Sequence, residues 1–301
     1  MMKTNFHGII PPVSTIFNTD GNLDEKGMAT VIDFLIDAHV DGLFFLGSGG
    51  EFSQMSVELR KEVAEFTTKY VAGRVPVLIG TGSSNTKEVV SLSQHAEKVG
   101  ADGVVVINPY YWTLTEENLF AHYTEIAESI ELPILLYNFP TLTGQDLPPE
   151  FVLRLVEKHE NIVGIKETID SIAHIENMIS TVKSRYPDFI VFAGFDNHLF
   201  NTLTLGGDGA ICASVNFAPE IAVGLYKAFR ENDLETAVQF HRKISGLPKM
   251  YNLDSPFIGV IKEAMKLRGL DISTYVLAPT SELSTEKKVQ LKEILKAADL
   301  L

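Results

Sequence analysis

Lys166 is the residue whose position in this sequence most strongly suggests chemistry. It ends the apolar run 162–165, and strand alternation places it on the same face as Ile162 and Gly164. If that face is the interior of a barrel, the amine lies out of water, where its charged form is destabilised. A neutral amine attacks a carbonyl carbon and forms a Schiff base. The alternative is a lysine at the strand exit that points to solvent or pairs with Glu167.

Tyr137 and the segment Gly47-Ser48-Gly49-Gly50 are two further candidates. Tyr137 also ends an apolar run, so its hydroxyl can relay a proton in a dry site; the alternative is a packing tyrosine. The glycine-rich segment offers unhindered backbone N–H groups before a helix, which suits a carboxylate or a phosphate. Its alternative is an ordinary turn between a strand and a helix.

Several other chemistries lack their motifs. No H-E-x-x-H is present, and the single cysteine, Cys212, excludes a disulfide within the chain and a zinc ribbon. Two glycine-rich turns begin at residues 47 and 80, but Phe52 and Asn85 occupy the position of the third glycine of G-x-G-x-x-G. Neither turn therefore completes this dinucleotide-binding motif. We therefore expect neither a metal nor an organic cofactor.

The composition limits the partners. The chain has 301 residues, of which 45% are hydrophobic, and its formal net charge is −14. An acidic protein is unsuited to nucleic acid or to an anionic membrane surface. The N-terminus lacks the apolar region of a signal peptide, and the apolar runs are shorter than the roughly 20 residues of a membrane span. We expect a soluble cytoplasmic protein.

Repeated apolar runs, each followed by an amphipathic stretch, indicate the fold. The runs cover residues 8–13, 42–46, 77–80, 103–107, 133–137, 162–166, 190–193 and 209–212. About eight such units predict a closed (β/α)₈ barrel over residues 1–230. An open doubly wound sheet normally has a glycine turn after its first strand, whereas Pro11-Pro12 follows here. Helical patterns at 233–243, 256–268 and 284–298 predict a C-terminal helical extension over 231–301.

Taken in order along the chain, the motifs resemble the N-acetylneuraminate lyase / dihydrodipicolinate synthase family of Schiff-base aldolases. The resemblance covers nearly the whole chain. Its motifs are Gly-Ile-Ile-Pro-Pro at 8–12 with Asp-Gly at 20–21, Gly-Ser-Gly-Gly-Glu at 47–51, Asn-Pro-Tyr-Tyr at 108–111, Tyr-Asn-Phe-Pro at 137–140, Gly-Ile-Lys-Glu at 164–167 and Gly-Gly-Asp-Gly at 206–209. Within the family the chain looks closest to the aldolases of 2-keto-3-deoxygluconate and its pentonate analogue, because of the segments 47–54 and 109–112.

The resemblance implies a role for each matching residue. Lys166 matches the lysine that forms the imine with pyruvate, and Tyr137 matches the tyrosine that moves protons at the substrate oxygen. Ser48 matches the hydroxyl that links the tyrosines, and the backbone of Ser48 and Gly49 would hold the pyruvate carboxylate. Tyr111 matches a tyrosine that reaches into the neighbouring subunit's site. We therefore expect a homotetramer built as a dimer of dimers.

Two positions depart from the family pattern. Gly49 stands where synthases and lyases usually have threonine, and Leu142 stands where dihydrodipicolinate synthases have the arginine that grips the aldehyde partner's carboxylate. The aldehyde formed from a sugar acid carries hydroxyl groups in place of that carboxylate, and hydroxyl groups need hydrogen-bonding partners near the seventh and eighth strands. The residues placed to bind them are Gly194, Asp196, Asn197 and Ser214.

Three functions remain open on the sequence alone. The leading one is a class I aldolase that cleaves a 2-keto-3-deoxy sugar acid to pyruvate and an aldehyde. The second is dihydrodipicolinate synthase, which condenses pyruvate with aspartate semialdehyde and is disfavoured by Leu142. The third is a barrel that binds a keto acid without catalysis, which the joint presence of Lys166, Tyr137, Tyr111 and Ser48 disfavours.

Overall fold

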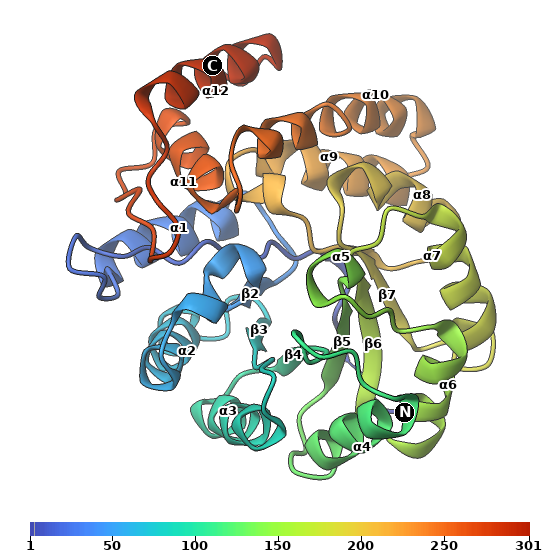
Figure 1. The fold of residues 1–301 in the computed structure, drawn as a ribbon. Helices are drawn as coiled ribbons and strands as arrows, with labels where there is room; N and C mark the ends of the chain where they lie inside the picture. The colour runs from blue at the N-terminus through green and yellow to red at the C-terminus, as the bar shows by residue number, and fades with distance from the viewer. Residues whose placement is uncertain (3) are drawn as a thin grey trace.

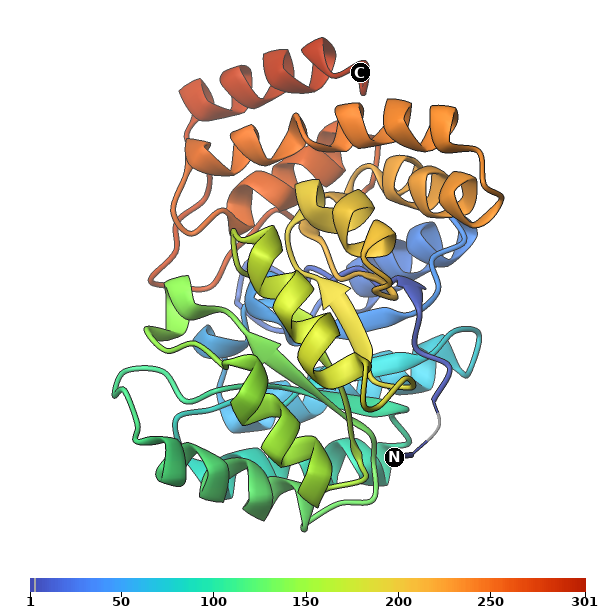
Figure 2. The same cartoon turned by 90° about the vertical axis from the view of Figure 1, so that its right-hand side faces the viewer.

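Eight short parallel strands curl into a barrel, with helices packed around it (Figures 1 and 2). The computed structural model describes residues 1–2 and 4–301. The strands are β1 (Gly8–Ile9), β2 (Leu43–Phe45), β3 (Val77–Gly80), β4 (Gly103–Ile107), β5 (Ile134–Asn138), β6 (Ile162–Glu167), β7 (Ile190–Ala193) and β8 (Gly209–Ala210). Every residue of these strands is buried, as their nearly continuous apolar sequences require of strands covered on both faces.

Hydrogen bonds close the barrel. Each strand pairs with the next from β2 to β8, and β8 pairs with β1. Beyond the end of β1, the Val13 N–H donates to the Phe44 carbonyl at 2.8 Å, which joins this segment to β2. A Cβ at Gly209 would overlap the Gly8 carbonyl, so only glycine allows β8 to approach β1 so closely. The predicted (β/α)₈ barrel is confirmed, and the open sheet is wrong.

The helices begin at the start signals in the sequence. Asp24, Ser56, Thr115 and Ser284 each accept a backbone N–H of the first turn that follows them. The helices are α1 (Glu25–Asp37), α2 (Val57–Val71), α3 (Thr86–Val99), α4 (Glu116–Ala127), α5 (Pro140–Thr143), α6 (Pro149–Lys158), α7 (Ile172–Met178), α8 (Leu199–Thr204), α9 (Pro219–Arg230), α10 (Leu234–Ile244), α11 (Ile258–Leu267) and α12 (Thr285–Ala297).

The last three helices gather on one side of the barrel (Figure 2). α10 packs on α9, and α12 packs on α11. The 3-10 helix Leu247–Leu253 (η6), which periodicity did not predict, connects α10 to the segment before α11. The boundary expected at residue 230 falls in the turn between α9 and α10 and stays a prediction. In the described part of the chain, each helix is too short or too polar to cross a membrane.

Candidate active site

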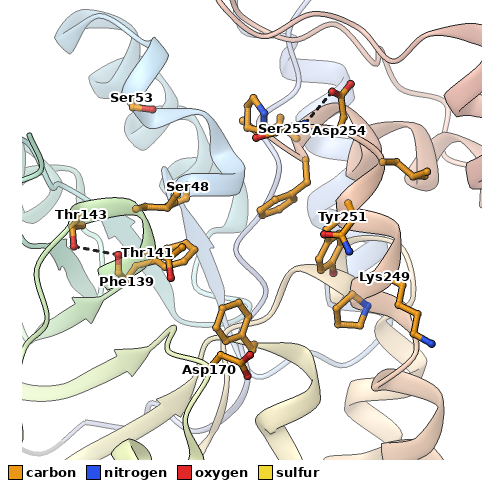
Figure 3. A pocket seen from close by; sticks show the side chains of 18 of the residues that line it. Ser48, Ser53, Phe139, Thr141, Thr143, Asp170, Lys249, Tyr251, Asp254 and Ser255 are labelled. Carbon is orange, nitrogen blue, oxygen red and sulfur yellow. Dashed lines mark hydrogen bonds between the residues drawn. The ribbon is translucent and has the colours of Figure 1, made fainter.

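A pocket of about 1180 Å³ lies at the carboxyl ends of the strands. Barrel loops form one wall, with Ser48, Phe139, Thr141 and Thr143, and the C-terminal segment forms the facing wall (Figure 3). The facing wall includes Lys249, Tyr251, Asp254 and Ser255. This is the end of a (β/α)₈ barrel where side chains from several different strands meet.

Lys166 lies near the end of β6 and is only 3% exposed. Its Nζ lies 4.1 Å from the centre of the Tyr137 ring and 5.3 Å from that of Phe44. Among the described residues, no carboxylate forms an ion pair with this nitrogen. Glu167, the next residue, points to the opposite face of the strand. Lys166 therefore neither points to solvent nor pairs with Glu167.

Three of the predicted residues converge. Tyr137 on β5 is the register partner of Lys166 on β6, which places both side chains at the same level of the barrel. The Tyr137 hydroxyl lies 3.4 Å from Oγ of Ser48, in the 3-10 turn Ser48–Gly50 (η1) that follows β2. The Lys166 amine thus lies on the face of the Tyr137 ring, and the Tyr137 hydroxyl lies beside that of Ser48. This arrangement can support imine formation and the proton transfers that accompany it.

The turn η1 has free backbone donors. The Gly50 N–H donates to the Gly47 carbonyl at 2.9 Å, and the Glu51 N–H donates to that of Ser48 at 3.3 Å. Within the described residues, the N–H groups of Ser48 and Gly49 have no acceptor. A Cβ at Gly49 would meet nothing closer than the Pro12 carbonyl, at 3.9 Å, so the space above the turn is open. Two free N–H groups beside open space can receive a carboxylate.

The four residues predicted to bind sugar hydroxyls divide into two groups. Asn197 lines the pocket, whereas Asp196 and Ser214 are buried, Gly194 is partly buried, and none of these three is among the residues that line it. The Asp196 carboxylate accepts the Ser214 N–H at 3.0 Å and the Tyr251 hydroxyl at 3.1 Å, so both of its oxygens are occupied. Burial raises the pKa of this carboxyl, against the effect of these hydrogen bonds. Sequence reasoning missed its partner Tyr251, whose ring forms part of the pocket wall (Figure 3).

Gly194 and Ser214 have different surroundings from Asp196. A Cβ at Gly194 would overlap the Thr168 hydroxyl, so no larger residue fits there without rearrangement. The Ser214 hydroxyl is buried beside the Asp196 carboxyl, and its interaction with that group opposes the rise of the Asp196 pKa.

Tyr111 is not brought to Lys166 within this chain. It is 89% exposed, and its φ of 107° is unusual for a residue with a side chain. Its ring packs edge to face on Trp112, with 5.6 Å between the ring centres, and Trp112 is also largely exposed. The role in a neighbouring subunit stays a prediction.

A polar cluster that sequence reasoning missed lies on the outer face of the same strands. Asn138 of β5 donates to Glu167 at 2.9 Å and to Asp146 at 2.8 Å. His174 of α7 bonds Asp146 at 3.1 Å and lies 3.5 Å from Glu167. Burial raises the pKa of Glu167 to about 7, although His174 and Asn138 oppose the shift. Strand alternation places Lys166 inside the barrel and Glu167 outside it, under α7. This alternation is the sequence signal that could have revealed the cluster.

Comparison with known proteins identifies the family. The model of the dihydrodipicolinate synthetase family matches residues 5–298, and the chain belongs to this family. It is 57% identical over 295 residues, 98% of each chain, to YagE of Escherichia coli strain K12, named as a candidate 2-dehydro-3-deoxy-D-gluconate aldolase. It is 56% identical over 296 residues, again 98% of each chain, to the probable 2-dehydro-3-deoxy-D-pentonate aldolase YjhH of the same strain. The crystal structure of YagE in complex with pyruvate superimposes with a TM-score of 0.98 and covers 99% of this chain and 100% of that one.

Proposed function

We propose that this member of the dihydrodipicolinate synthetase family is a class I aldolase that cleaves a 2-keto-3-deoxy sugar acid into pyruvate and an aldehyde. The observation that carries the proposal is the buried Lys166 amine, which pairs with no carboxylate of the described residues and lies on the face of Tyr137. The names of YagE and YjhH and the pyruvate bound to YagE support the substrate class.

The reaction begins at the keto carbon. The Lys166 amine adds to C2 of the substrate, and loss of water gives a protonated imine, which accepts electrons. The C4 hydroxyl loses its proton, the C3–C4 bond breaks, and its electron pair forms an enamine while C4 leaves as the aldehyde. Protonation of the enamine at C3 and addition of water release pyruvate and restore the amine. Tyr137 takes and returns protons at the substrate oxygens and exchanges them with Ser48.

The two ends of the substrate bind to different parts of the pocket. The N–H groups of Ser48 and Gly49 hold the carboxylate next to the reacting carbon. Asn197 on the pocket wall contacts a hydroxyl of the sugar chain, and Gly194 and Ser214 are further candidates for contact with that chain. Asp196 acts by orienting Tyr251, since its own oxygens are occupied.

Trapping of the imine tests this proposal directly. Borohydride added in the presence of pyruvate should reduce the imine, and peptide mass mapping should locate the adduct on Lys166. Lys262 is an internal control, because it is also buried but is paired with Glu51. An adduct on a different lysine, or no adduct, would contradict the mechanism. Pyruvate release from a panel of 2-keto-3-deoxy sugar acids would then identify the substrate.

The synthase reaction needs a cation at the aldehyde side of the pocket. Leu142 lines the pocket where the resemblance places an arginine, and it is 59% exposed. Of the lysines on the wall, Lys287 is held by Asp254 at 2.9 Å. We expect kcat/KM for a 2-keto-3-deoxy pentonate or hexonate to exceed that for condensation with aspartate semialdehyde by about 10²-fold or more. An equal or reversed preference would favour the synthase and would point to Lys249 as the substitute cation.

Assembly would complete the site. The proposal includes a homotetramer, a dimer of dimers, in which Tyr111 of one subunit reaches the site of its neighbour. Exposed Tyr111 and Trp112 supply the aromatic area typical of an interface core. Light scattering should detect the tetramer, and a fully active monomer would contradict this role of Tyr111. A barrel that only binds would instead show a thermal shift with pyruvate and no turnover of any sugar acid.

A further inference from the structure

Glu51 follows the turn η1 directly and is itself in an unusual position. Its backbone is left-handed, with a φ of 65°, a conformation that favours glycine. Its side chain has no exposed surface, and one carboxylate oxygen accepts the Leu277 N–H at 2.8 Å. A charged residue with unfavourable backbone geometry is thus buried beside the proposed carboxylate site.

The partner of Glu51 comes from the C-terminal extension. Lys262 of α11 has no exposed side-chain surface, and its Nζ forms an ion pair with the other Glu51 oxygen. The same nitrogen donates to the Tyr275 carbonyl at 2.7 Å and lies 4.7 Å from the centre of the Phe17 ring. The ion pair therefore ties η1 to α11, to the segment 275–277 and to the segment that follows β1.

Stability alone gives a weak reason for this arrangement. A buried ion pair usually stabilises a fold no better than apolar residues of the same shape, because both charges lose their hydration. The pair does meet a specific need of η1, whose residues Gly49 and Gly50 leave its backbone intrinsically free. Thr15 Oγ1 holds the turn from one side, by donating to the Gly50 carbonyl at 2.8 Å, and Glu51 holds its end.

We infer that the Glu51–Lys262 ion pair positions the N–H groups of Ser48 and Gly49, so that the C-terminal extension sets the affinity of the barrel for the keto acid's carboxylate. This rests on the proposed function. Both residues are positioning residues, since neither side chain reaches the open space above η1. Their loss should weaken pyruvate binding while the Lys166 and Tyr137 chemistry continues.

The double variant E51Q/K262M separates positioning from stability. It removes both charges at nearly constant volume, so the thermal midpoint should return close to that of the unmodified protein, whereas either single variant leaves one buried charge unpaired. The pyruvate concentration that gives half-maximal borohydride trapping should rise about tenfold, the effect of weakening one charge-assisted hydrogen bond. The maximal trapping rate should change less than about threefold. A half-maximal concentration equal to that of the unmodified protein would overturn the inference.

A second ion pair on the same helix supplies the matched control. Glu263 of α11 pairs with Lys288 of α12 at 3.0 Å, and among the described residues neither side chain forms a hydrogen bond or ion pair with η1. The variant E263Q/K288M should leave the half-maximal pyruvate concentration unchanged. An increase equal to that of E51Q/K262M would mean that any disturbance of α11 weakens binding, and it would refute a specific role for Glu51 and Lys262.

A milder variant keeps the inference testable if the double variant does not fold. E51D retains both charges but shortens the arm by about 1.5 Å, one carbon–carbon bond. It should raise the half-maximal pyruvate concentration several-fold, and an unchanged value would again overturn the inference. Failure of the proposed function gives a different result, because the unmodified protein would then show no pyruvate adduct on Lys166.

Discussion

Lys166 and Lys262 are both buried beside aromatic rings, but their polar surroundings differ. Lys166 faces the aromatic rings of Tyr137 and Phe44 and has no carboxylate partner in the described part of the chain. Lys262 contacts the Glu51 carboxylate and donates to the Tyr275 carbonyl. An aromatic ring attracts the cation through its face and leaves the N–H groups without a conventional hydrogen bond. A carboxylate and a carbonyl accept hydrogen bonds from the N–H groups and occupy them.

Burial has different consequences for the two lysines. Burial with strong acceptors makes Lys262 a fixed connection between distant segments. Burial without them leaves Lys166 open to an incoming carbonyl, at a cost in stability that the rest of the barrel has to offset. The surroundings of each amine, more than its burial, therefore separate a reactive lysine from a structural one.

The largest expected effect is on catalysis, in the variant K166M. Turnover should fall by at least about 10⁴-fold, because the substitution removes the amine that forms the imine in the proposed mechanism. The thermal midpoint should stay equal or rise, since the substitution removes a buried amine that pairs with no carboxylate in the described part of the chain. Pyruvate release and thermal unfolding measure the two effects. A loss of stability as large as that of K262M would remove the contrast between the two lysines.

Removal of the Tyr137 hydroxyl comes next. Y137F should lower turnover by about 10²–10⁴-fold, the scale for a positioned proton donor, with little change in stability. Y123F is the matched control, because the buried Tyr123 hydroxyl has no hydrogen-bond partner among the described residues and lies on α4. That variant should keep full activity. Equal rates for Y137F and the unmodified enzyme would make Tyr137 a packing residue.

The variant K262M tests the structural side of the comparison. Removing the amine leaves the Glu51 carboxylate buried and unpaired, which should lower the free energy of unfolding by about 3–5 kcal/mol. Urea denaturation measures this loss, and the second substitution E51Q should recover most of it. If K262M unfolded at the same urea concentration as the unmodified protein, Lys262 would not be a structural lysine.

The smallest expected effect concerns Glu167, on the face of β6 opposite to Lys166. Folding raises its pKa to about 7 because burial favours the protonated form. Its stabilising contribution is therefore complete below about pH 4.5 and is lost as the pH rises through 7, by on the order of 3 kcal/mol. Stability measured against pH should show this loss in the unmodified protein and a flatter curve in E167Q.

Imine trapping in E167Q tests whether Glu167 affects the reactivity of Lys166. The maximal trapping rate should remain within a few-fold of normal, since Glu167 lies across the strand from the amine. A large fall would show that the outer carboxyl acts on Lys166 and that the amine is less isolated from carboxylates than its contacts indicate.

The fold could be predicted from sequence because its signals are local. Buried parallel strands are nearly all apolar, and β3, β4 and β7 have the predicted limits. The meeting of Lys166, Tyr137 and Ser48 follows from strand alternation together with barrel closure, so it too was accessible. The helix η6 was not, because a 3-10 segment that contains Pro248 lacks the 3.6-residue period.

Contacts between distant segments were beyond sequence reasoning. The substrate contact of Asp196 stays a prediction, and residue spacing could not reveal that Ser214 and Tyr251 also bond its oxygens. The pair of Glu51 and Lys262 left one signal, since Lys262 lies on the buried, apolar face of α11. A buried lysine indicates that a polar or charged partner exists but does not identify that partner, because packing of the whole barrel determines which residue lies beside it.

The hydrogen bond from the Leu277 N–H to Glu51 also orders events during synthesis of the chain. These residues are 226 positions apart, so at about 5–20 residues per second the ribosome adds Leu277 roughly 10–45 s after Glu51. Throughout that interval the glycine-rich turn exists without its anchor, even when the strands beside it have been made. The nascent barrel therefore acquires this anchor only after all eight strands have been made, and a chain interrupted before α11 would carry Lys166 and Tyr137 beside a turn that Leu277 and Lys262 do not yet hold.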